Sequence, residues 1–513
     1  VPRLCWLLML PLAGVLVYGL VALELFGPQR PPKRQGAGAP AGGSASSPAV
    51  AQVPQPGRRR APPEAASAGS AEELHVVFTA DCRPYTAWQA EMLFHSARMV
   101  QQQGPITAII SGCSDAVQAH MQRRHRSLGW LAGFTQYFVP AFNDAKSRYS
   151  SKPLGFRHWY KHAGPSRDVV AVLDCDFAFL RPLTAVSAVH TRVGFPRQWD
   201  GPMPDRVKPG IVVSQRYEII PLSGNKLFDL EVQPAFVGHG LGGAAFLNWV
   251  CSGDESGHGD SGCTGQTEGA MGISHSSGVP YIAHRNDWDW LADSWANIHS
   301  RLHKHAPETA QLHVDMYSWS LANMHKGQKQ FILENLMLSY DGAGDQDWTP
   351  VDTLQVDVCH TGFDDVLAHP TRGHDPVGTL GQRPLKQQIP PFLHYCLPVR
   401  LPYPSFKAQD DGRLFSKYWF DFGMQSGQPH VLERCNETAA SRQGSHFPAA
   451  LTWLKRAPPR RTEPNASMPA EERRNRFLAC AARALFRKAA QATCPDSPLA
   501  KDLLEESEPA AGE

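Results

Sequence analysis

Between residues 74 and 174 the chain alternates short apolar runs with segments of helical periodicity, and this alternation limits the folds open to it more than any other feature. Four of the apolar runs have the length and composition of β-strands. They are residues 75–80, 105–111, 135–140 and 168–174. Strands that alternate with helices in this way are joined by right-handed crossovers and lie mostly parallel. The pattern therefore predicts an α/β fold with a mainly parallel central sheet.

The fourth run, DVVAVLD at residues 168–174, has a continuous apolar interior, which indicates a strand buried in the centre of the sheet. Asp174, Cys175 and Asp176 follow at its carboxyl end, the edge at which open α/β sheets bind ligands. Two carboxylates separated by one residue can hold one divalent cation through oxygen ligands. Such a cation neutralises the diphosphate of a nucleotide sugar, so the motif indicates glycosyl-transfer chemistry.

A haloacid-dehalogenase-like phosphohydrolase is the competing enzyme class, because it also places two aspartates after a strand. That class requires threonine or valine two residues after the second aspartate. Here Phe177 and Ala178 follow Asp176, and this disfavours the phosphohydrolase.

Three side chains further along the chain have two readings each. His394, in the segment PPFLHYC, either completes the cation site with its imidazole or is a hydrogen-bonded histidine at a strand end. Lys407 either contacts phosphate as a point charge or faces water. Asp315, in HVDMYSWSLA, either accepts hydrogen bonds from a sugar that packs on the neighbouring rings or belongs to an amphipathic core helix.

The eleven cysteines include no CxxC pair, which argues against a structural zinc module and leaves disulfides as the alternative. Cys82 can pair with Cys113, because each follows one of two adjacent predicted strands. Cys480 can pair with Cys494 around a predicted helix end. Cys175, inside the acidic motif, is expected to be a buried free thiol.

The two ends of the chain differ in composition from its centre. Residues 4–23 form an uncharged stretch of about 20 residues, so residues 1–27 are predicted to be a transmembrane signal anchor, with a cleaved signal peptide as the alternative. Residues 28–72, rich in Pro, Gly, Ala and Ser, are predicted to be a disordered stalk. Residues 73–435 form the predicted catalytic domain. Residues 436–513 form a C-terminal extension, with a helix at 471–490 and a disordered end. The net charge of +2 gives no general attraction for nucleic acid.

Five sequence blocks resemble, in the same order, the plant and green-algal hydroxyproline O-arabinosyltransferases and peptidyl serine alpha-galactosyltransferases. They are FTADCRPYTAWQAEMLFHSAR (78–98), KPLGFRHWYKH (152–162), VVAVLDCDF (169–177), DMYSWSLA (315–322) and FLHYCLP (392–398). The resemblance implies a GT-A-like, Rossmann-type nucleotide-sugar domain. It also implies a single-pass type II protein of the Golgi or endoplasmic reticulum membrane, with its catalytic domain in the lumen.

The same resemblance implies retaining transfer of a sugar from a UDP-sugar to serine or hydroxyproline of hydroxyproline-rich, cell-wall type glycoproteins. Asp174 and Asp176 match the Asp-Ala-Asp triplet of the galactosyltransferases better than the Glu-Pro-Asp triplet of the arabinosyltransferases. Ser318 and Trp319 depart from both groups. Galactose and arabinofuranose therefore both stay open as the donor sugar.

Within this resemblance, Asp174, Asp176 and His394 are predicted to hold Mn²⁺ or Mg²⁺ against the UDP diphosphate. Asp315 is predicted to hold hydroxyl groups of the donor sugar or the acceptor, so Asp176 and Asp315 are the predicted catalytic residues.

Three more residues are predicted to bind the nucleotide. Tyr85 packs on uracil, while Lys152 and Lys407 offset phosphate charge. The alternative to an enzyme is a non-catalytic luminal glycan-binding or scaffold protein on the same fold.

Overall fold

The computed structural model describes part of the chain in detail. The described residues are 73–129, 133–142, 150–190, 204–217, 277–305, 314–328, 330–339, 346–354, 389–395 and 468–494, with 359, 399–400, 413–415 and 432. The chain divides into two compact units, residues 1–65 and 66–513, and the described residues all belong to the second. The predicted anchor (1–27), the predicted stalk (28–72) and Lys407 lie outside the described residues. No helix in the described ranges has both the length and the apolar character needed to cross a bilayer.

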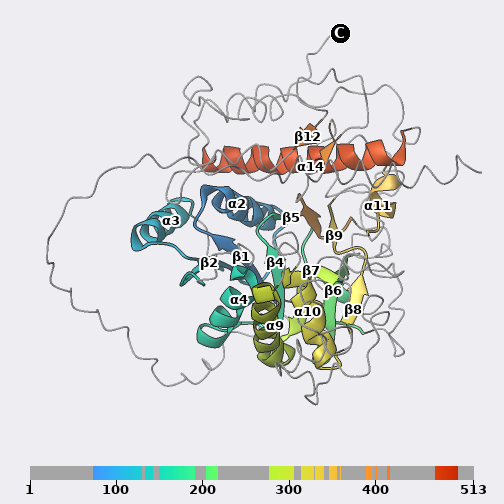
Figure 1. Cartoon of the computed structure of the whole chain (residues 1–513). Coiled ribbons are helices and arrows are strands. Elements are labelled where there is room, and N and C mark those ends of the chain that lie inside the picture. The colour runs from blue at the N-terminus through green and yellow to red at the C-terminus, as the bar shows by residue number, and fades with distance from the viewer. Residues whose placement is uncertain are drawn as a thin grey trace, which may run out of the picture. The chain divides into compact units, whose positions relative to one another are not determined.

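A seven-stranded sheet forms the centre of the second unit (Figure 1), in the order β3-β2-β1-β4-β7-β6-β8. Its strands are β1 (Leu74–Asp81), β2 (Ile106–Ser111), β3 (Phe134–Val139), β4 (Val169–Asp174), β6 (Val212–Arg216), β7 (Ser277–His284) and β8 (Gln330–Leu333). Neighbouring strands are parallel throughout β3-β2-β1-β4 and between β6 and β8. Strand β7 runs antiparallel to both β4 and β6. The prediction of an α/β fold with a mainly parallel sheet is confirmed.

Helices cover both faces of this sheet. The longer ones are α2 (Pro84–Met99), α3 (Asp115–Ser127), α4 (Ser151–His162), α9 (Arg285–His305) and α10 (Val314–His325), and a short one is α5 (Ser187–His190). The short helix α11 (Thr349–Asp352) packs instead on α14 (Ala470–Thr493). Successive side chains of a strand point to opposite faces. On β1, Phe78 meets Phe94 of α2 with ring centroids 5.4 Å apart, and His75 meets Trp159 of α4 at 5.0 Å. Helices α2 and α4 therefore pack on opposite faces of β1.

A smaller sheet continues directly from β4. It contains β5 (Phe177–Phe179), β10 (Phe392–His394) and β9 (Met337–Leu338), in the order β5-β10-β9. A separate two-stranded sheet joins β11 (Val399–Arg400) to β12 (Arg413–Phe415). Strand β10 runs antiparallel to β5, and this register sets His394 opposite Phe177. Residues more than two hundred positions apart in the sequence thus become neighbours.

Helix α14 (Ala470–Thr493) occupies the position where the sequence predicts a helix at 471–490. It packs on α2 and contributes its apolar side to a second buried cluster. In that cluster Trp88 of α2 stacks on Tyr395, with ring centroids 5.9 Å apart, and meets Phe486 of α14 edge to face at 6.0 Å. Helix α14 is therefore part of the folded body.

Two disulfides between described residues join segments that are distant in sequence. Cys82 pairs with Cys113, as predicted, and ties the carboxyl end of β1 to that of β2. The predicted pairing of Cys480 with Cys494 is wrong, because Cys480 pairs with Cys359. The physical reason is helix geometry: 14 residues of helix span about 21 Å, far more than the separation a disulfide allows. Cys494, at the end of α14, is itself disulfide-bonded, and Cys175 forms no disulfide and is half-buried rather than fully buried.

Removing the disulfide between Cys359 and Cys480 is expected to destabilise the protein by about 2–4 kcal/mol, because the bridge closes a loop of 121 residues and restricts the unfolded chain. The variant is the double substitution Cys359→Ser and Cys480→Ser, and the measurement is denaturant-induced unfolding. Cys175→Ser is the matched control, since this thiol forms no disulfide. Equal unfolding midpoints for the wild type and the double variant would contradict the expectation.

Candidate functional site

The candidate site lies where the strand order of the large sheet reverses. Strands β2 and β3 lie on one side of β1, whereas β4 lies on the other. In open α/β sheets such a reversal opens a crevice at the carboxyl ends of the two central strands. Asp81 ends β1 and Asp174 ends β4, and the register sets Asp174 opposite Thr79. The acidic motif therefore stands at the edge of the sheet where a ligand is expected.

Asp174, Asp176 and His394 come together at this edge. Each offers one ligand atom, and the three atoms all lie within 4.8 Å of one another. The Nε2 atom of His394 is 3.3 Å from Oδ1 of Asp176, and both side chains are buried. The pairing of β10 with β5 delivers the histidine, and the backbone N–H of Tyr395 donates to the carbonyl oxygen of Asp176 at 3.2 Å.

These residues fit a divalent cation. Two carboxylates and one imidazole are ligand types that suit Mn²⁺ and Mg²⁺. Among the described residues, no other group of His, Cys, Asp and Glu brings three ligand atoms this close together. Burial raises the pKa of the Asp174 carboxyl, the ammonium of Lys152 opposes that rise, and the charges of Asp176 and Asp315 add to it. A bound cation would favour the charged carboxylate.

Lys152 lies between two carboxylates. Its Nζ atom is 2.5 Å from Oδ1 of Asp174 and 2.5 Å from Oδ2 of Asp315. Burial acts to lower the pKa of this ammonium, but Asp174 and Asp315 outweigh burial and raise it. Lys152 lies in the first turn of α4, and its positive charge reaches the site and neutralises the two carboxylates there. The predicted contact of Lys152 with phosphate stays a prediction.

Asp315 stands in the first turn of α10 and is almost completely buried. Its carbonyl oxygen accepts hydrogen bonds from Nε1 of Trp295 at 2.9 Å and from the hydroxyl of Ser318 at 2.8 Å. Lys152 links its carboxylate to Asp174. The neighbouring rings of Tyr317 and Trp319 are 0% exposed, so they belong to the core and offer no free face to a sugar.

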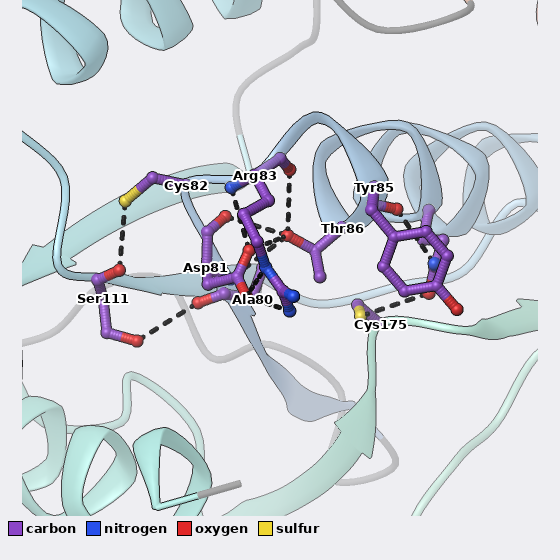
Figure 2. Close-up of polar contacts among 9 residues, drawn as sticks. Ala80, Asp81, Cys82, Arg83, Tyr85, Thr86, Ser111 and Cys175 are labelled. Carbon is purple, nitrogen blue, oxygen red and sulfur yellow. Dashed lines mark hydrogen bonds and ion pairs between the residues drawn. The ribbon is translucent and has the colours of Figure 1, made fainter. Parts of the chain in front are cut away.

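Tyr85 lies in the first turn of α2, near this edge of the sheet (Figure 2). Asp81 accepts hydrogen bonds from the backbone N–H of Arg83 at 2.9 Å, from Nε of Arg83 at 2.6 Å and from the hydroxyl of Thr86 at 2.7 Å. The side-chain amide of Gln89 donates to the carbonyl oxygen of Tyr85 at 2.9 Å. Its oxygen accepts from the thiol of Cys175 at 3.5 Å. Gln89 therefore connects Tyr85, the residue predicted to pack on uracil, to Cys175 of the acidic motif.

Sequence reasoning did not single out Asp81, Arg83, Gln89 or Tyr217 as parts of the site. Asp81, Arg83 and Gln89 lie in the sequence block 78–98 that resembles the galactosyltransferases. Their position just after a predicted parallel strand could have indicated that they belong to the site. Tyr217 follows β6, and its hydroxyl is 3.4 Å from Nδ1 of His394. No motif in the sequence connects these two residues.

Comparison with known proteins identifies the class of protein that this chain resembles: glycosyltransferases. No family model matches the chain. Two curated relatives are both peptidyl serine alpha-galactosyltransferases. The protein from Arabidopsis thaliana is 25% identical over 134 residues, which cover 25% of this chain and 16% of the relative. The protein from Chlamydomonas reinhardtii is 30% identical over 114 residues, which cover 21% of this chain and 14% of the relative.

The predicted resemblance to the peptidyl serine alpha-galactosyltransferases is therefore confirmed, over about a quarter of the chain. The matched region spans only about one seventh of the length of these curated relatives.

Two solved glycosyltransferase structures also align with the chain. The galactosyltransferase LgtC, in complex with donor and acceptor sugar analogs, is 11% identical and aligns over 66% of this chain and 92% of its own, with a TM-score of 0.29. The bifunctional glycosyltransferase WbbM is 10% identical over 64% of this chain and 46% of its own, also with a TM-score of 0.29. TM-scores of this size do not establish a common fold.

Proposed function

We propose that this chain is a metal-dependent glycosyltransferase that moves a sugar from a UDP-sugar to serine or hydroxyproline of a polypeptide. The observation that carries the proposal is the convergence of Asp174, Asp176 and His394 at the carboxyl end of β4, next to the strand reversal. The names of the curated relatives support the same class of reaction.

In this proposal Asp174, Asp176 and His394 hold Mn²⁺ or Mg²⁺. The cation supplies positive charge that stabilises the departing nucleoside diphosphate. Lys152 holds Asp174 and Asp315 in place, because its ammonium contacts both carboxylates. Asp315 accepts hydrogen bonds from hydroxyl groups of the sugar or the acceptor, and Tyr85 packs on uracil. The GT-A-like character and the retaining stereochemistry belong to the same proposal.

Galactose is the favoured donor sugar and arabinofuranose is the second choice, because the names of both relatives specify galactosyl transfer to serine. Asp174 and Asp176 also follow the pattern of that group.

We further propose that the protein acts in the lumen of the Golgi or endoplasmic reticulum, held by residues 1–27. Disulfides persist in oxidising compartments, and the bridges of Cys82 with Cys113 and of Cys359 with Cys480 support a luminal body.

The proposal is tested by incubating the purified full chain with serine-rich and hydroxyproline-rich peptides and Mn²⁺, separately with UDP-galactose and with UDP-arabinofuranose. We expect UDP release and a peptide mass increased by one sugar with one donor, most strongly with UDP-galactose and serine peptides. A chelator should stop the reaction, and added Mn²⁺ should restore it. Peptide binding without UDP release under every condition would instead indicate a glycan-binding or scaffold protein.

A further inference from the structure

The imidazole of His394 is held from three sides. Its ring stacks on Phe177, with centroids 4.4 Å apart and an angle of 20° between the planes. Its Nε2 atom faces Asp176 at 3.3 Å, and its Nδ1 atom faces the hydroxyl of Tyr217 at 3.4 Å. Stacking fixes the plane of the ring, but a flip of 180° about the Cβ–Cγ bond keeps that plane and exchanges each ring nitrogen with a ring carbon. The contact of Tyr217 with Nδ1 selects the orientation that keeps Nε2 at the acidic pair.

The local structure provides room for Tyr217 to reach this position. The pairing of β6 with β7 shifts register between Ser214 and Gln215, and such irregularities re-aim the side chains that follow. Gly278 of β7 faces the ring of Tyr217. A Cβ atom on Gly278 would lie 2.6 Å from Cδ2 of Tyr217 and 3.1 Å from Sδ of Met316. Glycine inside a strand often marks such a close approach by another group.

We propose that Tyr217 is a positioning residue for the metal ligand His394. When Nε2 directs its lone pair at a cation, Nδ1 carries the proton and donates it to the hydroxyl oxygen of Tyr217. Histidines that bind metals donate their other ring N–H to such a partner, and loss of the partner weakens metal binding or activity by about 10- to 100-fold. Gly278 serves the same arrangement by leaving space for the tyrosine ring. This inference rests on the proposed metal-dependent function.

The test is Mn²⁺ affinity of the full chain in the presence of UDP, measured by electron paramagnetic resonance of free Mn²⁺, together with the melting temperature of each variant. Tyr217→Phe keeps the ring and removes the hydroxyl, and we expect Mn²⁺ affinity to fall by about 10- to 100-fold with little change in melting temperature. Tyr281→Phe is the matched control. Tyr281 is a buried tyrosine of β7 whose hydroxyl has no hydrogen-bond partner among the described residues, so its loss should leave Mn²⁺ affinity unchanged.

Gly278→Ala provides an independent variant that retains the hydroxyl but displaces the ring, and it should also weaken Mn²⁺ binding. If the wild type binds Mn²⁺ and both Tyr217→Phe and Gly278→Ala bind it equally well, Tyr217 has only a packing role and this inference fails alone. If the wild type itself binds no Mn²⁺ with UDP, the metal-dependent function fails, and this inference fails with it.

Discussion

Asp176→Asn is expected to lower the rate of metal-dependent UDP release by at least about 10³-fold, equivalent to about 4 kcal/mol of transition-state stabilisation. The amide keeps the shape of the side chain but removes the negative charge from a buried position beside His394. A neutral ligand holds a divalent cation less firmly and leaves the diphosphate charge less well balanced. The measurement is the initial rate of UDP release at saturating Mn²⁺.

Asp168→Asn is the matched control for this substitution. Asp168 precedes the opposite end of the same strand, is largely exposed and pairs with Arg285 on the surface. Its loss should change the rate by no more than about twofold, since exposed ion pairs contribute little. A fully active Asp176→Asn enzyme would show that the Asp176 carboxylate does not have its proposed role, provided that circular dichroism shows both variants folded.

Acidification from pH 7 to pH 5 is expected to lower the free energy of unfolding by about 6 kcal/mol through three buried histidines. Burial lowers the pKa of His75 to about 3, and it lowers the pKa of His95 and of His299 to about 4. In the unfolded chain each titrates near pH 6.5. The unfolded state therefore binds more protons between about pH 6.5 and pH 4, so stability is complete above this window and is lost as the pH falls through it.

Each histidine contributes about 2 kcal/mol of this loss at pH 5, because its pKa in the unfolded chain lies about 1.5 units above that pH. Total stabilities of about 5–15 kcal/mol make the sum large enough to approach unfolding. Denaturant titrations at both pH values measure the effect, and His75→Gln should reduce the difference by about one third. His162→Gln, at an exposed position, is the control. A free energy of unfolding that stays the same from pH 7 to pH 5 would show that the three histidines are protonated in the folded protein.

The parallel half of the large sheet could be predicted from the sequence because each of its strands is a short apolar run between helical segments. The antiparallel direction of β7 could not, because an apolar run such as that of Tyr281 and Ile282 looks the same in either direction. Spacing alone likewise gave the wrong partner for Cys480, since connectivity depends on how α14 packs.

Much of the candidate site was accessible from the sequence, but its internal contacts were not. The strand end predicted that Asp174 and Asp176 act together, and the resemblance added His394. Within the resemblance Lys152 was predicted to offset phosphate charge, whereas its ammonium in the structure contacts two carboxylates. No pattern in the sequence pointed to Tyr217. Its proposed role depends on the space beside Gly278 and on a contact with His394, 177 positions away in the sequence.

The pairing of β10 with β5 has a consequence for biosynthesis. The ribosome makes β1, β4 and the first two acidic ligands long before it makes His394, so the large sheet can assemble while the third ligand is still absent. Contacts between such distant segments form late, because a long loop must close first. If Asp174, Asp176 and His394 bind a cation as proposed, a nascent chain would offer only two of the three ligands until His394 has been made and the small sheet is completed.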